Sequence, residues 1–165
     1  MPFKFQGRLP YILLVATTLV LDRWTKFLIQ TRFDLNESVP VIDGFFNITS
    51  VRNTGVAFGI FSSLDSPAKS VVLSAFTAVA AALVTVYSMR APARNRLLQI
   101  ALASILGGAL GNLYDRLAYG YVIDFLEFYI GSYHWPSFNI ADSAISIGVV
   151  LLTIEVIRNE APGHG

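Results

Sequence analysis

Three polar motifs interrupt the apolar second half of this chain: GNLYDR at residues 111–116, VIDF at 122–125 and FNIADS at 138–143. Each motif contains one aspartate, Asp115, Asp124 or Asp142, beside or within segments apolar enough for a lipid bilayer. Ionisable groups at membrane depth are costly, so they are candidates for function. We therefore interpret the remaining chain as a scaffold that brings two of these carboxylates together.

The composition indicates a membrane protein. Of 165 residues, 54% are hydrophobic and only 14% are charged, whereas soluble domains carry about 25% charged residues. The net charge of +1 provides no basic field for nucleic acid. Cysteine is absent, which excludes disulfides, thiolate metal sites and a cysteine nucleophile. With only two histidines, we expect neither a metal centre nor another cofactor.

Four apolar stretches are long enough to cross a bilayer, which takes roughly 17–25 helical residues. They lie at residues 9–29, 68–87, 97–113 and 138–157. The first is long for a cleaved signal peptide and has charged residues at its far end, so we expect it to be retained. Three glycines of the third stretch, Gly107, Gly108 and Gly111, are typical of closely packed membrane helices. We predict a single membrane domain over residues 1–165 with four transmembrane helices.

Two longer connections, residues 31–67 and 116–137, are too polar to span a membrane. The first contains β-favouring runs at 45–51 and 56–61, which predict a small sheet or hairpin on the membrane surface. The second is rich in aromatic residues, which suit a membrane interface, and we predict a short interfacial helix at Phe125–Ile130. The predicted fold class is thus an all-α polytopic membrane protein with a small extracytoplasmic sheet and this interfacial helix.

The distribution of basic residues predicts the orientation of the chain. Short loops count most in the positive-inside rule, and the loop at residues 89–96 contains three arginines and no acidic residue. Lys4, Arg8 and Arg158 fall on the same side. We therefore place both termini in the cytoplasm. The polar connections then face outward, and the aspartates lie near the outer face.

Polar residues in the first half of the chain allow both structural and functional interpretations. Asp22 and Lys26 are four residues apart and share a helix face. They could form an interfacial ion pair in which Lys26 extends to the headgroups, or Asp22 could face the bundle and brace a site. Asn53 and Gly55 suit a tight turn, because both tolerate left-handed backbone.

Local structure could also explain the polar motifs of the second half. Asn112, Asp115 and Arg116 lie three and four residues apart, so they cluster on one helix face. Arg116 could pair with Asp115 or with another carboxylate. Asn139 and Asp142 have the spacing of a capping box at the start of the fourth helix.

Taken together, Asp124 and Asp142 suggest an active site. Two carboxylates close together in a low-dielectric pocket cannot both be ionised, so they share one proton. The charged carboxylate can act as a general base on a water while the protonated one polarises a carbonyl, which is the chemistry of an aspartic protease. Because the positive end of the fourth helix favours a charge on Asp142, we expect Asp124 to hold the shared proton.

The order of the motifs resembles that of the lipoprotein signal peptidases, also called signal peptidase II, over nearly the whole chain. The matching motifs are Asp22 with Lys26, NTGVAFG at 53–59, GNLYDR at 111–116, Asp124 with Phe125, and FNIADS at 138–143. The resemblance implies an aspartic endopeptidase of the bacterial inner membrane. Such an enzyme removes the signal peptide from prolipoproteins by cutting on the N-terminal side of a cysteine that carries a diacylglyceryl group.

The resemblance also implies a set of site residues. Asp124 and Asp142 would be the catalytic pair. The implied substrate-binding or supporting residues are Asp22, Lys26, Asn53, Gly55, Asn112, Asp115, Arg116, Asn139 and Ala141. Asp115 is the rival for a place in the pair, and we prefer Asp124 because Asp115 has Arg116 beside it. The first polar connection would form a β-cradle.

The implied partners are diacylglyceryl prolipoproteins and membrane lipids. We expect a monomer that binds no nucleic acid and no metal.

Three rival functions stay open at this point. A small ion-coupled transporter or proton channel would also use intramembrane carboxylates, although these acids cluster near one face and no repeat is present. A metal-dependent lipid transferase would hold Mg²⁺ with several carboxylates, although Arg116 adjoins the cluster. The third rival is a purely structural membrane subunit.

Overall fold

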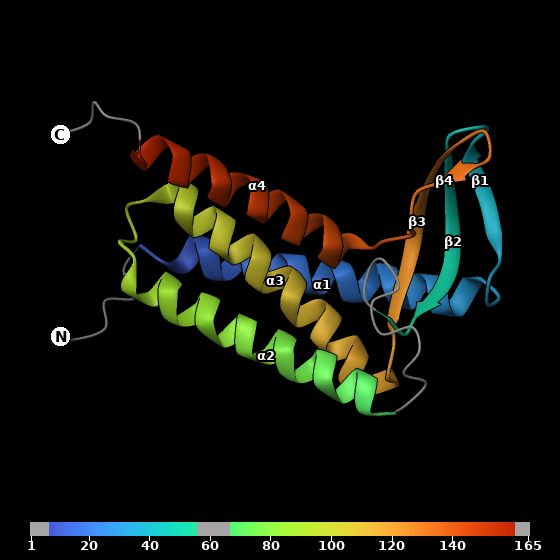
Figure 1. The fold of residues 1–165 in the computed structure, drawn as a ribbon, viewed down its shortest axis with the longest axis horizontal. Coiled ribbons are helices and arrows are strands. Elements are labelled where there is room, and N and C mark those ends of the chain that lie inside the picture. Colours follow the sequence, from blue (N-terminus) through green and yellow to red (C-terminus); the bar gives the residue numbers. More distant parts are fainter. Residues whose placement is uncertain (1–6, 56–66, 161–165) are drawn as a thin grey trace.

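The computed structural model describes residues 7–55 and 67–160, whose four helices form an elongated bundle with a small sheet at one end (Figure 1). The helices are α1 (Leu9–Arg32), α2 (Pro67–Arg90), α3 (Arg96–Tyr119) and α4 (Ile140–Glu160). Each helix coincides with one of the predicted apolar stretches and extends beyond it by a few residues at one or both ends. The start of α1 and the end of α4 lie at the end of the bundle remote from the sheet.

Helix α3 is the centre of the bundle, because it packs against each of the other three helices. In its most apolar window 61% of the residues are buried, against 11% in α2 and 17% in α4. Gly108 and Gly111 permit this packing. A Cβ atom at Gly108 would collide with the carbonyl oxygen of Ala141, and one at Gly111 would lie 2.6 Å from Asp22 Oδ2. The predicted close packing at these glycines is therefore confirmed.

Three helices in the described part of the chain, α2, α3 and α4, are long and apolar enough to cross a membrane. Helix α1 has a similar length but carries Asp22, Arg23 and Lys26 in its second half. Length and composition therefore support three of the four predicted spans.

Helix α3 ends six residues later than the predicted span. Its first turn is capped by Asn95, whose side-chain oxygen accepts a hydrogen bond from the backbone N–H of Leu98 at 3.2 Å. Gly120 ends the helix with a φ of 80°, a left-handed conformation that glycine adopts without strain. As a result, Asp115 and Arg116 lie inside the helix, as their expected clustering on one helix face requires.

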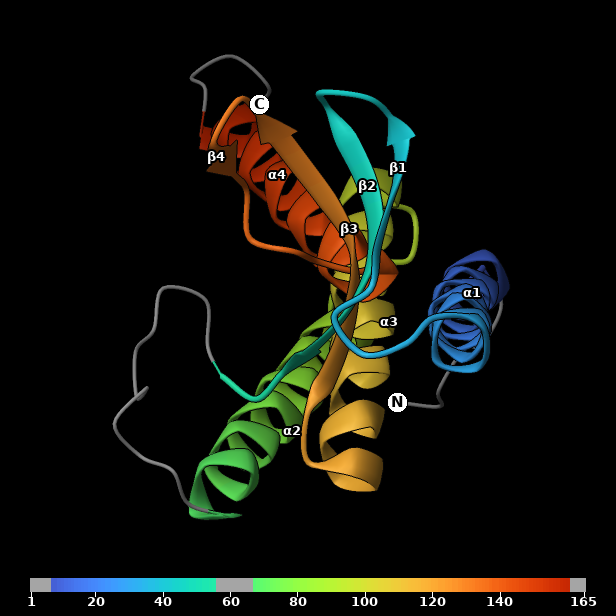
Figure 2. The same ribbon diagram turned by 90° about the vertical axis from the view of Figure 1, so that its right-hand side faces the viewer.

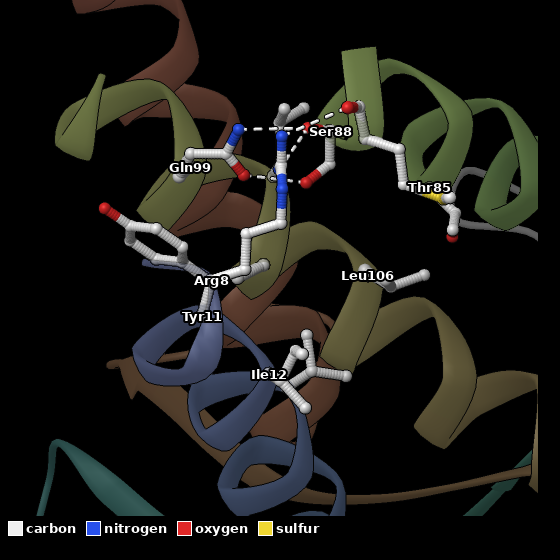
Figure 3. A pocket seen from close by; sticks show the side chains of 11 residues that line it. Arg8, Tyr11, Ile12, Thr85, Ser88, Gln99 and Leu106 are labelled. Carbon is white, nitrogen blue, oxygen red and sulfur yellow. Dashed lines mark hydrogen bonds between the residues drawn. The ribbon is translucent and has the colours of Figure 1, made fainter. Parts of the chain in front are cut away.

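Polar side chains close the end of the bundle that is remote from the sheet (Figure 3). The guanidinium of Arg8 donates hydrogen bonds to three backbone carbonyl oxygens, those of Ser88 (2.6 Å), Met89 (3.0 Å) and Ala91 (2.9 Å). The buried amide of Gln99 donates to the same carbonyl of Ser88 at 3.0 Å. These bonds satisfy the free carbonyls at the end of α2. A cavity of about 280 Å³ lies beside them between α1, α2 and α3, and none of the predicted site residues lines it.

Both polar connections contribute strands to one antiparallel sheet. Its strands are β1 (Ser38–Ile42), β2 (Phe46–Asn53), β3 (Val122–Ile130) and β4 (Tyr133–His134), in the order β1-β2-β3-β4. Figure 2, which looks at the molecule from the sheet end, shows these strands across the ends of the helices. The predicted run at 45–51 is confirmed by β2, whereas the run at 56–61 lies outside the described residues.

The prediction of an interfacial helix at Phe125–Ile130 is wrong, because these residues belong to β3. The segment is rich in aromatic and β-branched residues, which favour strands, and β2 supplies a hydrogen-bonding edge. Ile123 and Phe125 are buried against Ile29 of α1. The described residues therefore combine four helices with a small four-stranded sheet, as expected, and β3 of this sheet takes the place of the expected interfacial helix.

Candidate active site

The predicted catalytic pair, Asp124 and Asp142, lies where the sheet meets the bundle; we call these two residues the dyad. Asp124 is the third residue of β3 and is 2% exposed. Asp142 lies in the first turn of α4 and is half-buried. The strand β3 and the helix α4, with β4 between them in the chain, thus place their carboxylates at the same end of the bundle.

Asn139 joins the two members of the dyad. Its side-chain Nδ2 donates to Asp124 Oδ1 at 2.7 Å, and its backbone N–H donates to Asp142 Oδ2 at 3.3 Å. In return, the backbone N–H of Asp142 donates to Asn139 Oδ1 at 2.9 Å. The last two bonds form the predicted capping box. Asn139, which caps the start of α4, therefore also binds the carboxylate of Asp124 on β3.

Two further amides complete the surroundings of the dyad. Asn53 Nδ2 donates to Asp124 Oδ2 at 2.9 Å, and Asn112 Nδ2 donates to Asp142 Oδ1 at 2.7 Å. Each of the four carboxylate oxygens thus accepts a hydrogen bond from an asparagine. No ion pair involves either carboxylate within the described ranges 7–55 and 67–160.

The electrostatic consequence is seen at Asp124, which lies outside the helices. Burial raises the pKa of the Asp124 carboxyl to about 7, and the charge of Asp142 acts in the same direction. Hydrogen bonds from Asn53 and Asn139 act against this rise in pKa, as does the charge of Lys26. A carboxyl with a pKa near neutrality can both hold and release a proton under physiological conditions.

A second group of charged side chains is linked to the dyad through Asn112. We call this group, which consists of Asp22, Arg23, Lys26 and Asp115, the ion cluster. Lys26 Nζ lies 2.8 Å from Asp22 Oδ2 and 2.8 Å from Asp115 Oδ2. Arg23 pairs with Asp115 Oδ1. Asp22, Lys26 and Asp115 are fully buried. The alternative in which Asp22 faces the bundle is confirmed, and the alternative in which Lys26 extends to the headgroups is wrong.

Asp115 is an ion-pair partner, as one interpretation of its motif held, but its cations are Arg23 and Lys26 of α1 instead of the adjacent Arg116. The guanidinium of Arg116 contacts Thr77 Oγ1 at 3.5 Å. Sequence reasoning missed Arg23 entirely. Its position one turn before Lys26 on the same helix was the available signal.

The structure also places the remaining predicted site residues. The backbone N–H of Gly55 donates to Asn53 Oδ1 at 2.9 Å, so the predicted turn at Asn53–Gly55 orients the amide that binds Asp124. Ala141 is fully buried, and its backbone N–H donates to Asp22 Oδ1 at 3.0 Å. Gly55 therefore contacts a residue that binds the dyad, whereas Ala141 connects the backbone just before Asp142 to Asp22.

Comparisons with known proteins agree with this arrangement. The model of the family described as Signal peptidase (SPase) II matches residues 14–158 of the chain. A lipoprotein signal peptidase of Syntrophus aciditrophicus (strain SB) is 47% identical over 154 residues, which are 92% of this chain and 96% of that protein. One of Geobacter sulfurreducens (strain ATCC 51573 / DSM 12127 / PCA) is 47% identical over 146 residues, which are 88% of this chain and 90% of that protein.

Two solved structures have the same fold. Both are described as bacterial membrane enzymes. The first has a TM-score of 0.83 and 33% identity and covers 98% of this chain and 96% of that chain. The second has a TM-score of 0.79 and 37% identity and covers 92% of this chain and 94% of that chain. With the family match over most of its length and relatives of this similarity, the chain belongs to the signal peptidase II family of lipoprotein signal peptidases.

Proposed function

We propose that this bacterial membrane peptidase removes the signal peptide from prolipoproteins as an aspartic endopeptidase, with Asp124 and Asp142 as its catalytic residues. The observation that carries the proposal is the position of Asn139, which donates hydrogen bonds to both carboxylates. One residue can bind both only if the two aspartates border the same small space. A pair of carboxyls in such a setting can share one proton.

In the proposed reaction, Asp142 enters as the carboxylate and Asp124 as the neutral acid. Asp142 takes a proton from a water, whose oxygen attacks the scissile carbonyl carbon while the Asp124 proton is donated to the carbonyl oxygen. The tetrahedral intermediate then collapses. The C–N bond breaks, the departing amine takes the proton from Asp142, and Asp124 recovers its proton from the intermediate's hydroxyl. No metal ion or cofactor is needed.

The fold supports a location at the outer membrane face. We propose that α1 is the fourth span, because Asp22 and Lys26 are fully buried and neutralise each other, so they do not contact lipid. The start of α1 and the end of α4 share one end of the bundle (Figure 1), with the arginines of residues 90–96 between α2 and α3. The positive-inside rule places that end in the cytoplasm and the dyad near the outer face.

The proposed substrate is a prolipoprotein whose cysteine already carries a diacylglyceryl group, cut on the N-terminal side of that cysteine. A helical carbonyl is already hydrogen-bonded, so the scissile segment must unwind before attack. Asn53 and Gly55, at the end of β2, are placed to hold such an extended segment beside Asp124. The largely unburied faces of α2 and α4 leave room for lipid and acyl chains.

The transporter interpretation gains no support from the relatives, which are signal peptidases. The carboxylates also do not form a path across the bundle, since both members of the dyad lie at its sheet end.

The direct test is cleavage of a diacylglyceryl-modified prolipoprotein by the purified protein, compared with Asp124→Asn and Asp142→Asn. Asp43→Asn, at an exposed turn between β1 and β2, is the matched control. We expect the control to cut at the wild-type rate and both dyad variants to lose cleavage. Cleavage retained in either dyad variant would contradict the proposed mechanism.

A further inference from the structure

Lys26 connects the ion cluster to the dyad. An ammonium group has three N–H donors and no acceptor. Here the group is fully buried, with Asp22 Oδ2 at 2.8 Å, Asp115 Oδ2 at 2.8 Å and Asn112 Oδ1 at 3.0 Å. Two of these neighbours are carboxylates that balance its charge. The third is the amide that binds Asp142, so Lys26 is one residue removed from the dyad.

The contact with Lys26 decides which way the Asn112 amide faces. Because an ammonium can only donate, the amide oxygen turns toward Lys26 and the amide NH₂ turns toward Asp142, with Nδ2 at 2.7 Å from Asp142 Oδ1. The opposite orientation would place an NH₂ against the ammonium and an oxygen against the carboxylate, and both contacts would be repulsive.

The other two amides of the site are oriented by backbone N–H groups. The N–H of Gly55 binds Asn53 Oδ1 at 2.9 Å, and the N–H of Asp142 binds Asn139 Oδ1 at 2.9 Å. Besides Lys26, Asn112 Oδ1 receives one longer bond, from Asn139 Nδ2 at 3.2 Å. The orientation of the Asn112 amide therefore depends on a charged side chain, whereas the orientations of the Asn53 and Asn139 amides depend on backbone N–H groups.

The two acids that hold Lys26 also fix the backbone just before each member of the dyad. Asp115 Oδ2 accepts a hydrogen bond from the N–H of Ile123 at 3.2 Å, the residue before Asp124. Asp22 Oδ1 accepts one from the N–H of Ala141 at 3.0 Å, the residue before Asp142. The ion cluster therefore contacts both catalytic segments, just before Asp124 and just before Asp142.

We propose that Lys26 is a positioning residue for the hydrolysis: it holds the Asn112 amide so that its NH₂ faces Asp142, and through Asp22 and Asp115 it fixes the spacing of the two catalytic segments. This inference rests on the proposed function of the dyad. It assigns Lys26 a role in the reaction beyond neutralising buried acids, because the orientation of one catalytic carboxylate depends on it.

The test separates the donor function of Lys26 from its charge. Loss of Lys26 alone would leave two buried acids with too few cations, so the variants also carry Asp22→Asn, whose Oδ1 can still bind the N–H of Ala141. The three chains to compare are Asp22→Asn, Asp22→Asn with Lys26→Gln, and Asp22→Asn with Lys26→Met. Glutamine and methionine have similar length and no charge, but only glutamine can donate to Asn112.

We expect the methionine variant to lose kcat by on the order of 10- to 100-fold relative to Asp22→Asn, because misplacing a catalytic group costs that much. The glutamine variant should keep at least about a tenth of the kcat of Asp22→Asn, the lower edge of that range. KM should stay nearly constant in both, since neither change touches the substrate.

The pH–rate profile measures how removal of the positive charge of Lys26 changes the pKa of Asp124. The charged groups around Lys26 are Asp22 and Arg23 on α1, Asp115 and Arg116 on α3, Asp124 on β3 and Asp142 on α4. Its positive charge lowers the pKa of Asp124. Both double variants should therefore keep activity to higher pH on the basic limb, by the same amount.

Equal kcat in the glutamine and methionine variants would overturn the orienting role of Lys26. If the methionine variant does not fold, the kcat of the glutamine variant decides: a kcat below about a tenth of that of Asp22→Asn overturns the donor role, and a kcat above that level supports it. Asp124→Asn in the same assay separates a failure of the proposal for Lys26 from a failure of the proposed function. Activity in that variant would refute the dyad itself, whatever the Lys26 variants do.

Discussion

Two groups of aspartates are connected through Lys26 and Asn112 in this protein, and they are stabilised in different ways. In the ion cluster, Asp115 is bound by the cations of Arg23 and Lys26. In the dyad, Asp124 is bound by the neutral amides of Asn53 and Asn139. Both carboxylates are buried. The difference is that a cation cancels the charge of a carboxylate, whereas an amide binds it and leaves the charge in place.

This difference explains which acids can do chemistry. A buried carboxylate that is paired with cations serves as structure, because breaking the pair is costly. A buried carboxylate that is bound by neutral donors loses hydration without an adjacent cation to offset the loss, which disfavours its charged form. Its pKa therefore rises, as that of Asp124 does to about 7. In the proposed mechanism, the same residue type therefore supports the fold at one position and transfers protons at another.

The largest expected effect tests the chemical side of the comparison. Asp124→Asn should reduce cleavage by about 10³-fold or more, because it removes a group that donates and recovers a proton. Its folding stability should be preserved, since asparagine retains hydrogen bonding without a buried charge. Cleavage rate and thermal unfolding in the same detergent measure both, with Asp43→Asn as the exposed control. An Asp124→Asn protein that unfolds would assign this aspartate to structure.

The structural side of the comparison is tested by Asp115→Asn. This change leaves Lys26 and Arg23 with one carboxylate fewer, and breaking a buried pair costs roughly 3–5 kcal/mol. We expect a large fall in the midpoint of thermal unfolding. A variant of wild-type stability with no activity would instead move Asp115 into the catalytic pair.

A third prediction concerns stability as a function of pH. The folded-state pKa of Asp124 is raised above its ordinary value of 3.8 to about 7. The stability that this group contributes is therefore fully present below about pH 4, the unfolded value, and is lost as the pH rises through the folded value. Asp124→Asn should remove this loss, so its unfolding midpoint relative to wild type should be higher at pH 8 than at pH 4. A constant difference at the two pH values would exclude a raised pKa.

The smallest expected effect concerns the asparagine amides that bind the dyad. The hydrogen bond from Asn53 lowers the pKa of Asp124, so Asn53→Ala should raise that pKa further and move the basic limb of the pH–rate profile upward. Asn47 makes a similar cross-strand bond to Glu127 Oε2, at 2.9 Å, farther along the same pair of strands. Asn47→Ala is therefore the matched control and should leave the profile unchanged. A downward or absent shift in Asn53→Ala would show that the amide does not stabilise the charged form.

The sequence was sufficient to locate the helices and to nominate most of the site. Apolar length marked all four helices, and the capping-box spacing of Asn139 and Asp142 marked the start of α4. The same pattern could not show that Asn139 also binds Asp124. That contact joins a helix cap to a neighbouring strand, and neither spacing nor periodicity encodes which strand will lie there.

One wrong prediction and one alternative that the sequence leaves open have the same physical origin. The aromatic content of residues 125–130 predicts an interfacial helix, whereas the strand that pairs with them, β2, lies about 80 residues earlier in the chain. The sequence leaves open whether Arg116 pairs with Asp115 or with another carboxylate, whereas the cations that bind Asp115 lie on α1. In both cases a partner distant in sequence outweighed the local pattern.

The most direct measurement is infrared spectroscopy of the protonated-carboxyl band as a function of pH, in wild type, Asp124→Asn and Asp115→Asn. Asp22→Asn is included because Asp22 is also fully buried. We expect a band that titrates with a midpoint near 7, disappears in Asp124→Asn and persists in Asp22→Asn and in the fraction of Asp115→Asn that remains folded. A band that survives Asp124→Asn, or no titrating band between pH 5 and pH 9, would contradict it.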